Sequence, residues 1–479
     1  MELGNLLSST ISILPELILV IASLVIILFT TSVRKTYRSY SFFIAIAAIC
    51  LSFIFNLDRF TNPENAFAGA LSLDVFSAYF NSIFLIGALF TTLISKDYMV
   101  EDENIGEYFA LILLSTTGMM FLSSAKEFVS LFIGFEIMSI SVYILSGFNK
   151  KSISSTESGI KYLILGGFSS AILLYGIALL YGATGSVFLD KILAGFDYGN
   201  PLYLTGAVLV LIGFLFKIGA VPLHQWIPDI YEGAPTPVTA FMSVAVKAAG
   251  FAVLLRVLFE GVNAAGLGIS TVLLIVSILT MTVGNISAIT QKSIKRMLAY
   301  SSIAHAGYAL IGIIAKINGE EGALSGVLYY LYAYTIMNMG AFAIICYLSR
   351  ENKEVNDYEN ISGLWTRKPY TAICLAIFMF SLAGIPPTLG FFAKYRIFLS
   401  AVEAQLYALA VIGIINSVIS AYYYLKVLVY AFMHSEKYSF EPYKPISMIA
   451  IVILSIGALL FGLFPLYSID LAIKAANSL

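Results

Sequence analysis

Long apolar runs follow one another along the chain, separated by short polar stretches. A helix that crosses a membrane needs about 20 mostly apolar residues, and this criterion predicts fourteen spans. The apolar residues within each run are continuous and do not alternate with polar ones, which favours helices over a transmembrane barrel. The predicted spans cover residues 11–31, 40–57, 72–95, 106–124, 127–148, 158–182, 202–226, 238–260, 267–289, 295–316, 323–348, 371–398, 404–431 and 446–473.

The composition agrees with a membrane protein. Of the 479 residues, 59% are hydrophobic and only 11% are charged, whereas a soluble domain carries about 25% charged residues. Because the apolar runs continue from one end to the other, we expect a single all-α, polytopic membrane domain over residues 1–479. The formal net charge of −1 gives no indication of nucleic-acid binding, so the lipid bilayer is the expected surroundings.

The spacing of the cysteines does not indicate a metal site, and the first apolar run does not have the pattern of a cleaved signal peptide. Cys50, Cys346 and Cys374 each lie inside an apolar run, without the spacing of a metal or cluster site. We expect three small buried residues and no metal. The chain start lacks the basic segment of a cleaved signal peptide, which favours a retained first span.

Basic residues are concentrated in every second loop. Cytoplasmic loops of membrane proteins are enriched in Lys and Arg, so we place these loops in the cytoplasm and both termini on the outer side. The opposite loops carry only scattered basic residues, such as Arg59, Lys126, Lys191 and Lys316. The concentrated set is Arg34, Lys35, Arg38, Lys150, Lys151, Lys292, Lys295, Arg296, Arg350, Lys353, Arg367, Lys368, Lys437 and Lys444.

A weak internal repeat connects the two halves of the chain. EIMSISVYILSGF at 136–148 aligns with SSIAHAGYALIGI at 301–313, five spans later. The seventh and twelfth spans are both interrupted by glycine and proline, at Gly219 and Pro222 and at Gly384, Pro386 and Pro387. An odd offset inverts the orientation, so we expect inverted five-helix repeats with broken helices, as in many transporters. A simple kink is the alternative at each break.

The expected repeats divide the chain into four parts. The first repeat contains spans 4–8 over residues 106–260, and the second, inverted repeat contains spans 9–13 over residues 267–431. Three spans within residues 1–95 precede them, and one span over residues 446–473 follows.

Five ionisable residues lie inside apolar runs, and they are Glu136, Lys161, Lys217, Lys247 and Lys394. At about 3 kcal/mol each on insertion scales, exposing all five to lipid costs roughly 15 kcal/mol. They must therefore face the bundle interior, pair with one another or reach water.

Three of the five, Glu136, Lys217 and Lys247, fall near the membrane midplane by their distance from the span ends. Burial disfavours a charged amine and a nearby carboxylate favours it, so a mobile pair can load and release a proton. We expect this chemistry between Glu136 and Lys217, with Lys247 next in line. The alternative for the pair is a static ion pair that joins two helices.

The remaining candidates are open to a second interpretation. Lys161 and Lys394 lie close enough to span ends for their ammonium groups to extend to the interface. His224 and His305 can connect lysines, because imidazole titrates near neutral pH, but a buried histidine is as often a packing residue.

The segment FKIGAVPLHQWIPDIYEGAPTPVTAFMSVAVKAAG, at 216–250, resembles the core of the antiporter-like subunits of respiratory complex I, NADH:quinone oxidoreductase. The same family includes Mrp antiporters and membrane-bound hydrogenase subunits. NDYENISGLWTRKP at 356–369 and FSLAGIPPTLGFFAKYRIF at 380–398 are most similar to its N-type members. The absence of a long lateral helix after the fourteenth span and the lysine at 394, where M-type members carry glutamate, favour the same type.

The resemblance implies roles by position. Glu136 matches the family's carboxylate on the fifth span and Lys217 its partner on the broken seventh span, while Lys161 matches a lysine of the sixth span. Lys247 matches the central lysine of the eighth span and Lys394 the lysine that releases protons outward. His224 and His305 match positions between the lysines. Lys217 precedes its helix break and Lys394 follows its own, so the two halves are not strictly equivalent.

The implied function is proton translocation in the membrane arm, coupled to electron transfer in other subunits. No cofactor or metal is expected in this chain, since FMN, iron–sulfur clusters and quinone belong to partner subunits. The implied partners are an M-type neighbour and the small A-, J- and K-type subunits in a bacterial cytoplasmic (inner) membrane. The alternatives are a subunit of an Mrp-type antiporter or of an F420H2-, ferredoxin- or hydrogen-linked relative, and a non-conducting scaffold.

Overall fold

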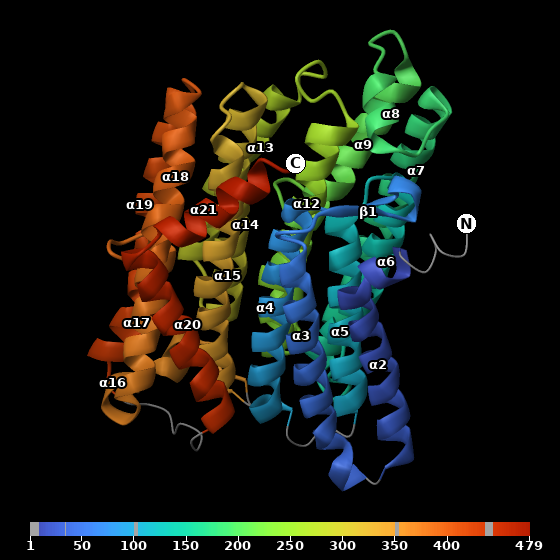
Figure 1. Ribbon diagram of the computed structural model, residues 1–479. Coiled ribbons are helices and arrows are strands. Elements are labelled where there is room, and N and C mark those ends of the chain that lie inside the picture. Colours follow the sequence, from blue (N-terminus) through green and yellow to red (C-terminus); the bar gives the residue numbers. More distant parts are fainter. Residues whose placement is uncertain (1–8, 34, 100–103, 350–353, 436–443) are drawn as a thin grey trace.

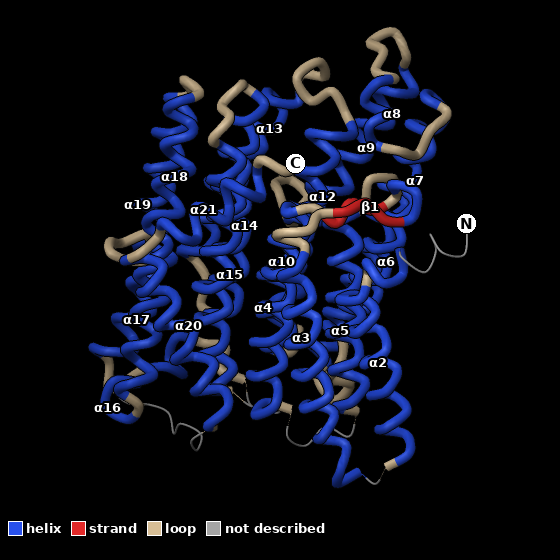
Figure 2. Tube along the Cα trace, in the orientation of Figure 1, coloured by secondary structure: helices blue, strands red, loops and turns tan. Residues whose placement is uncertain are grey.

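The computed structural model describes residues 9–33, 35–99, 104–349, 354–435 and 444–479. These residues form a bundle of long helices, with the loops gathered at its two ends (Figures 1 and 2). Within these ranges, thirteen helices are long and apolar enough to cross a membrane, and Pro369–Ala383 is a shorter apolar helix. The predicted all-α polytopic fold is confirmed.

The helices follow the predicted order. The first spans are α2 (Leu14–Ser32), α3 (Ser41–Asp58) and α4 (Val75–Tyr98), with the short turn η1 (Lys35–Tyr40). The next group is α5 (Ile105–Ser124), α6 (Phe128–Ser146), α7 (Ile153–Thr184), α8 (Leu189–Ala194), α9 (Pro201–Ile218), α10 (Trp226–Gly233), α11 (Thr236–Phe241), η3 (Met242–Val246), α12 (Lys247–Arg256) and η4 (Val257–Gly261). The last group is α13 (Ile269–Ile289), α14 (Ile294–Ile317), α15 (Ala323–Leu348), η5 (Tyr358–Ile361), α16 (Leu364–Arg367), α17 (Pro369–Ala383), α18 (Leu389–Glu403), α19 (Tyr407–Met433), α20 (Pro445–Leu463) and α21 (Leu466–Ala476).

Both predicted helix breaks are present. The helix α9 ends at Gly219, where φ is +76°, and α17 ends at Gly384, where φ is +85°. Glycine adopts this left-handed conformation without steric cost, and it is the usual residue just after a helix. The second half of each broken span is a separate helix, α10 or α18. The twelfth predicted span is therefore two helices.

Replacing Gly219 by alanine is expected to reduce assembly of the protein in the membrane. The new Cβ would lie 1.9 Å from the Ile227 side chain, at a φ of +76°, and such a change costs more than about 1 kcal/mol. Gly167→Ala is the matched control, because its Cβ would meet nothing within 4 Å. Equal membrane levels and equal thermal stability of the two variants would contradict this reading of the break.

Two predictions need correction, and one element of the structure was not predicted. The last span does not continue to residue 473, because α20 ends at Leu463 and α21 begins after Pro465, which cannot donate a backbone hydrogen bond. Cys50 lies on the outer surface of the bundle, so the expectation of three buried cysteines is wrong for this residue. A two-stranded antiparallel hairpin, β1 (Glu64–Ala66) and β2 (Leu71–Leu73), was not predicted.

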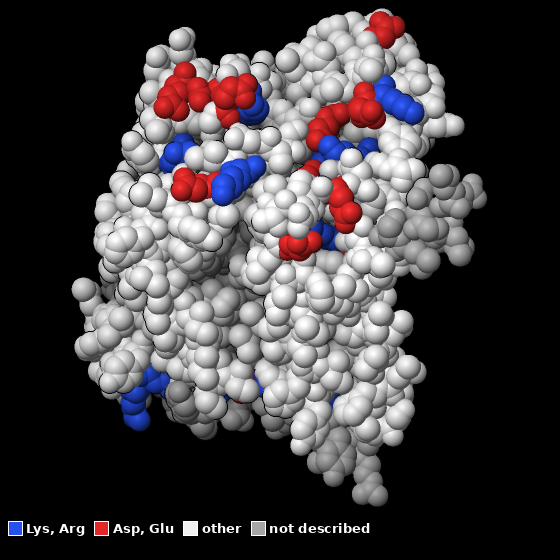
Figure 3. All heavy atoms as spheres, viewed as in Figure 1, with Lys and Arg blue, Asp and Glu red and all other residues white. Residues whose placement is uncertain are grey.

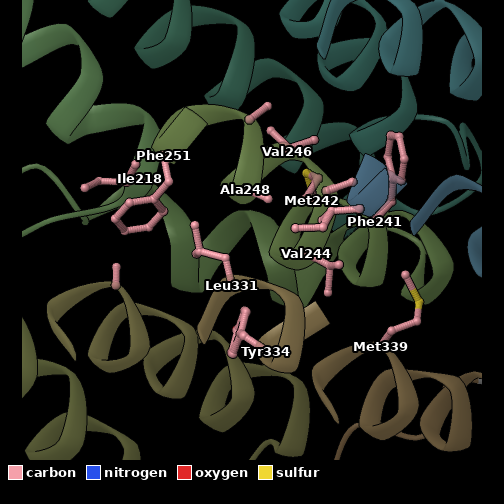
Figure 4. Close-up of a cluster of buried hydrophobic side chains, with 14 of the residues drawn as sticks. Ile218, Phe241, Met242, Val244, Val246, Ala248, Phe251, Leu331, Tyr334 and Met339 are labelled. Carbon is pink, nitrogen blue, oxygen red and sulfur yellow. The ribbon is translucent and has the colours of Figure 1, made fainter. Parts of the chain in front are cut away.

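The eighth span, Thr236–Gly261, occupies the centre of the bundle. Every residue in its most apolar window is buried. It contains two π-turns, η3 and η4, on either side of α12. Figure 4 shows apolar side chains of this span, such as Met242 and Val244, beside Leu331 and Tyr334 of α15. A lysine on this span is therefore far from any surface.

Charged side chains gather at the two ends of the bundle, and an apolar belt lies between them (Figure 3). The lower end in Figure 1 carries the loops that the sequence marks as basic, and we call it the basic end. Four of the basic residues used to predict the orientation lie outside the described residues, and they are Arg34, Arg350, Lys353 and Lys437.

Candidate functional site

Lys217 is the best enclosed of the lysines in the first half of the bundle. It lies in the last turn of α9 and is only 2% exposed. Its Nζ donates a hydrogen bond of 2.8 Å to Ser139 Oγ on α6, and it lies 4.9 Å from the centre of the Phe135 ring. Lys217 is thus held by a neutral hydroxyl and an aromatic face.

Glu136 lies on α6, the same helix as Ser139, and the expected proton exchange between Glu136 and Lys217 stays a prediction. Glu136 is half-buried, and its Oε1 has no hydrogen-bond partner among the described residues. No ion pair within 4 Å joins Glu136 to Lys217 in the structure. The alternative of a static Glu136–Lys217 ion pair is therefore wrong, since Ser139 occupies the contact position.

Lys247 is the first residue of α12 and is 3% exposed. Its Nζ donates 2.6 Å to the Ser302 carbonyl and also contacts Ser302 Oγ on α14. The π-turn η3 immediately precedes Lys247. Such turns are frequent at functional sites in helices.

His305 lies one turn beyond Ser302 on α14 and is almost completely buried. Its Nδ1 is 2.6 Å from Tyr330 OH and its Nε2 is 3.1 Å from Tyr424 OH. Tyr424 OH in turn contacts Ser301 Oγ. His305 is thus hydrogen-bonded between two tyrosine hydroxyls, and its role in linking the lysines stays a prediction.

Lys394 lies on α18, after the second break, and is 4% exposed. Its Nζ donates 3.0 Å to the carbonyl of Ala383, the last residue of α17, and 3.0 Å to Ser417 Oγ. The Tyr308 ring centre is 5.3 Å away. The break frees the Ala383 carbonyl from its helix, and Lys394 uses it. The alternative that Lys394 extends to the interface is wrong.

Lys161 is set apart from the other lysines. Its side chain is 41% exposed and pairs with Glu157 at 2.7 Å and with Asp229 at 3.0 Å. Asp229 also pairs with Arg296 at 2.9 Å. A cavity of about 220 Å³ lies over this cluster at the basic end. Lys161 therefore belongs to a charged network at the surface, in agreement with the alternative that its ammonium group extends to the interface. It does not join the buried lysines Lys217, Lys247 and Lys394.

His224, in the first break, is half-buried, and its Nδ1 has no hydrogen-bond partner among the described residues. The structure does not bring it into contact with Lys217 or Lys247. Its linking role stays a prediction.

Comparison with known proteins identifies the group to which this arrangement belongs. Residues 125–420 match the family described as NADH:quinone oxidoreductase/Mrp antiporter, transmembrane. The chain belongs to this family. NADH-quinone oxidoreductase subunit N of Trichlorobacter lovleyi is 42% identical over 97% of this chain and 96% of that protein.

Two solved structures show the same fold. A chain of respiratory complex I from Thermus thermophilus superposes with a TM-score of 0.82 at 32% identity, covering 95% of this chain and 99% of that chain. A chain of the membrane-bound sulfane sulfur reductase, an archaeal respiratory membrane complex, has a TM-score of 0.88 at 25% identity and covers 98% and 97%.

The hydrogen-bond partners of the buried lysines were not predicted from the sequence. They are hydroxyl groups on other helices, such as Ser139, Ser302 and Ser417, with Tyr424 beside His305. Serine and tyrosine are frequent along the whole chain, so no spacing distinguishes these ones.

A buried charge cluster near Gly261, at the end of the eighth span, was also not predicted from the sequence. Arg256 is completely buried and donates two hydrogen bonds of 3.0 Å to Asp74 at the start of α4. It also pairs with Glu260 at 3.2 Å and donates 2.9 Å to the Ser123 carbonyl. The cluster fastens the end of α12 to α4 and α5.

Proposed function

We propose that this chain is a proton-translocating membrane subunit of an NADH:quinone oxidoreductase, coupled to electron transfer in other subunits. One observation carries the proposal. Lys217, Lys247 and Lys394 are each under 5% exposed, and their hydrogen-bond partners among the described residues are serine hydroxyls and backbone carbonyls, not carboxylates.

This arrangement suits a changing charge better than a permanent one. A structural lysine in a protein interior is normally paired with a carboxylate, because an uncompensated buried charge is costly. Neutral hydroxyls and carbonyls accept hydrogen bonds from both the ammonium and the amine. Each site therefore tolerates loss of the proton, which a relay requires.

The order of the groups along the bundle supports a path between the lysines. Lys247 is bound to Ser302, and the neighbouring Ser301 contacts Tyr424, which is bound to His305. Tyr308, one turn further along α14, lies under Lys394. In the proposal, protons pass from Lys217 to Lys247 and then along this chain to Lys394. Glu136 modulates Lys217 electrostatically.

The proposal includes the setting of the subunit. The basic end faces the cytoplasm of a bacterium and both termini face outward, in line with the distribution of Lys and Arg. The two groups α5–η4 and α13–α19 act as inverted repeats. An M-type subunit and small A-, J- and K-type subunits are the neighbours, and FMN, iron–sulfur clusters and quinone are bound by partner subunits. Within the described residues, no group of three or more His, Cys, Asp or Glu side chains is arranged to hold a metal.

A second candidate keeps ion transport but changes the machine. The family match supports an Mrp-type antiporter as the alternative, and the likeness to the sulfane sulfur reductase complex supports a relative of that kind. The genes next to this one distinguish these machines, because each requires different hydrophilic subunits. A purely structural scaffold is disfavoured, because three unpaired buried lysines would weaken it.

Replacing Lys217 or Lys394 by alanine tests the proposal in the intact complex. We expect proton pumping and coupled quinone reduction to fall together, by about tenfold or more, as when a positioned proton-transfer group is removed. Pumping is followed with a pH-sensitive dye in inverted membrane vesicles, and assembly by native gel. Lys191→Ala, on the surface beside Phe188, is the control. Normal pumping in both lysine variants would refute the relay.

A further inference from the structure

A fourth lysine is fully buried, and the relay described above does not use it. Lys295 lies in the first turn of α14, at the basic end, and is 0% exposed. Its Nζ contacts Glu354 Oε2 at 2.5 Å and the Ala234 carbonyl at 2.8 Å. Lys295 differs from the three relay lysines because it is paired with a carboxylate.

Glu354 joins three parts of the bundle. Its Oε1 accepts hydrogen bonds from the Thr236 backbone N–H at 3.2 Å and from Thr236 Oγ1 at 3.1 Å, and it contacts Tyr98 OH. Thr236 is the first residue of α11, so the carboxylate caps the helix that leads to Lys247. Glu354 thus connects α4, the eighth span and α14.

A cavity reaches this pair from the basic end. It has a volume of about 340 Å³ and is lined mainly by polar groups, among them Tyr98, Glu232, Lys151 and Glu354. This volume is ample for several water molecules, each of which occupies about 30 Å³ in the liquid. Glu354 therefore stands between a polar cavity and a lysine that has no exposure of its own.

The inner side of the pair leads toward Lys247. Seven residues of α14 separate Lys295 from Ser302, a rise of about 10 Å, and Ser302 binds Lys247. Tyr231 of α10 and Tyr334 of α15 are buried on the two helices that pack beside α14 here. Hydrogen-bonding groups are thus present at Lys295 and at Ser302, the two ends of this interval.

We propose that Glu354 and Lys295 form a second proton entrance, which supplies Lys247 directly and does not pass through Lys217. A proton from the cavity binds a Glu354 oxygen and neutralises this carboxylate, which leaves the Lys295 ammonium without its ionic partner. Lys295 then gives one N–H proton inward, toward Ser302 and the Lys247 amine. The Glu354 proton moves to the Lys295 amine and restores the pair, so one proton enters and one leaves. The inference rests on the proposed function, because Lys247 is its acceptor.

A purely structural role for the pair makes a different prediction, which a double substitution tests in the intact complex. Glu354→Gln with Lys295→Met removes both titratable groups and leaves no net charge. The glutamine carbonyl can still accept from Thr236, so the cap is kept. The entrance predicts that pumping falls by at least about twofold at unchanged assembly, since only one of two inlets remains. Glu321→Gln, at an exposed surface pair, is the control.

Wild-type pumping in the double variant would refute the entrance and leave the pair as a structural clamp. Lys247→Met is measured in parallel, so that failure of the entrance and failure of the proposed function give different results. Loss of pumping in Lys247→Met with full pumping in the double variant overturns only the entrance. Full pumping in Lys247→Met overturns the proposed function itself.

A second measurement does not depend on assembly of the double variant. Lys151 lines the cavity and is exposed, so Lys151→Cys places a thiol at its mouth. A bulky, membrane-impermeant thiol reagent added from the basic end is expected to lower pumping by at least about twofold in this variant only. The parent protein, with its exposed Cys50, controls for labelling elsewhere. Labelled protein that pumps at the unlabelled rate would overturn the entrance.

Discussion

Replacing Lys247 by methionine is expected to abolish most proton translocation while the protein still assembles. Methionine has nearly the volume of the lysine stem and leaves no large cavity in the most deeply buried span. It removes the amine that binds Ser302, which is the central carrier of the proposed relay. A fall of about tenfold or more in NADH-driven pumping is expected, the size typical for loss of a positioned proton-transfer group.

Arginine at the same position separates the relay from a structural charge. A guanidinium keeps the positive charge and donates hydrogen bonds, but it does not release its proton in proteins. A relay predicts that Lys247→Arg pumps as poorly as Lys247→Met. A role in holding α12 against α14 predicts that arginine restores function. Recovery of normal pumping in an assembled Lys247→Arg complex would contradict the relay.

Much of the bundle could be predicted from the sequence because lipid imposes simple rules. A span must be long, apolar and helical to satisfy its own backbone, so every predicted run contains at least one helix. Glycine and proline marked both breaks, since a left-handed turn after α9 or α17 favours Gly219 and Gly384. The cost of burying charge pointed to Lys217, Lys247 and Lys394, which are all deep in the interior.

Side-chain partnerships were less accessible to sequence reasoning. Glu136 and Lys217 were expected to exchange a proton, with a static ion pair as the alternative, yet Ser139 binds the lysine. Which residue fills a contact position depends on the relative rotation of α6 and α9, which no pattern along one helix records. The same limit explains why Ser302 and Ser417 were missed.

Depth was a second source of error. Lys161 was placed within an apolar run, but α7 begins at Ile153 and leaves Lys161 beside Glu157 and Asp229 at the basic end. Asp229 belongs to α10, which reaches this site only because the seventh span is broken. A charge near a span end is therefore assigned reliably only once the neighbouring helix ends are known.

Arg256 carries the second large prediction, because its cluster holds the end of the Lys247 span that lies away from the basic end. The guanidinium is completely buried, with Asp74 at 3.0 Å and Glu260 at 3.2 Å. Glu260 is further paired with Lys126, so the four side chains are neutral in sum. Removing the central charge leaves the Asp74 carboxylate without its ionic partner, whereas Glu260 keeps Lys126.

We therefore expect Arg256→Ala to destabilise the protein by about 3–5 kcal/mol, the usual cost of removing one partner from a buried ion pair. The measurement is the amount of assembled complex in native gels and the temperature at which the purified complex dissociates. Lys316→Ala, at a solvent-exposed pair with Glu321, is the control and should cost less than about 1 kcal/mol.

A triple variant with Arg256→Met, Asp74→Asn and Glu260→Gln should recover part of the loss, because neutral side chains of similar size leave no unpaired carboxylate. Equal stability of Arg256→Ala and the control would mean that the cluster does not fasten α12, and that Lys247 is positioned by Ser302 and the apolar packing alone.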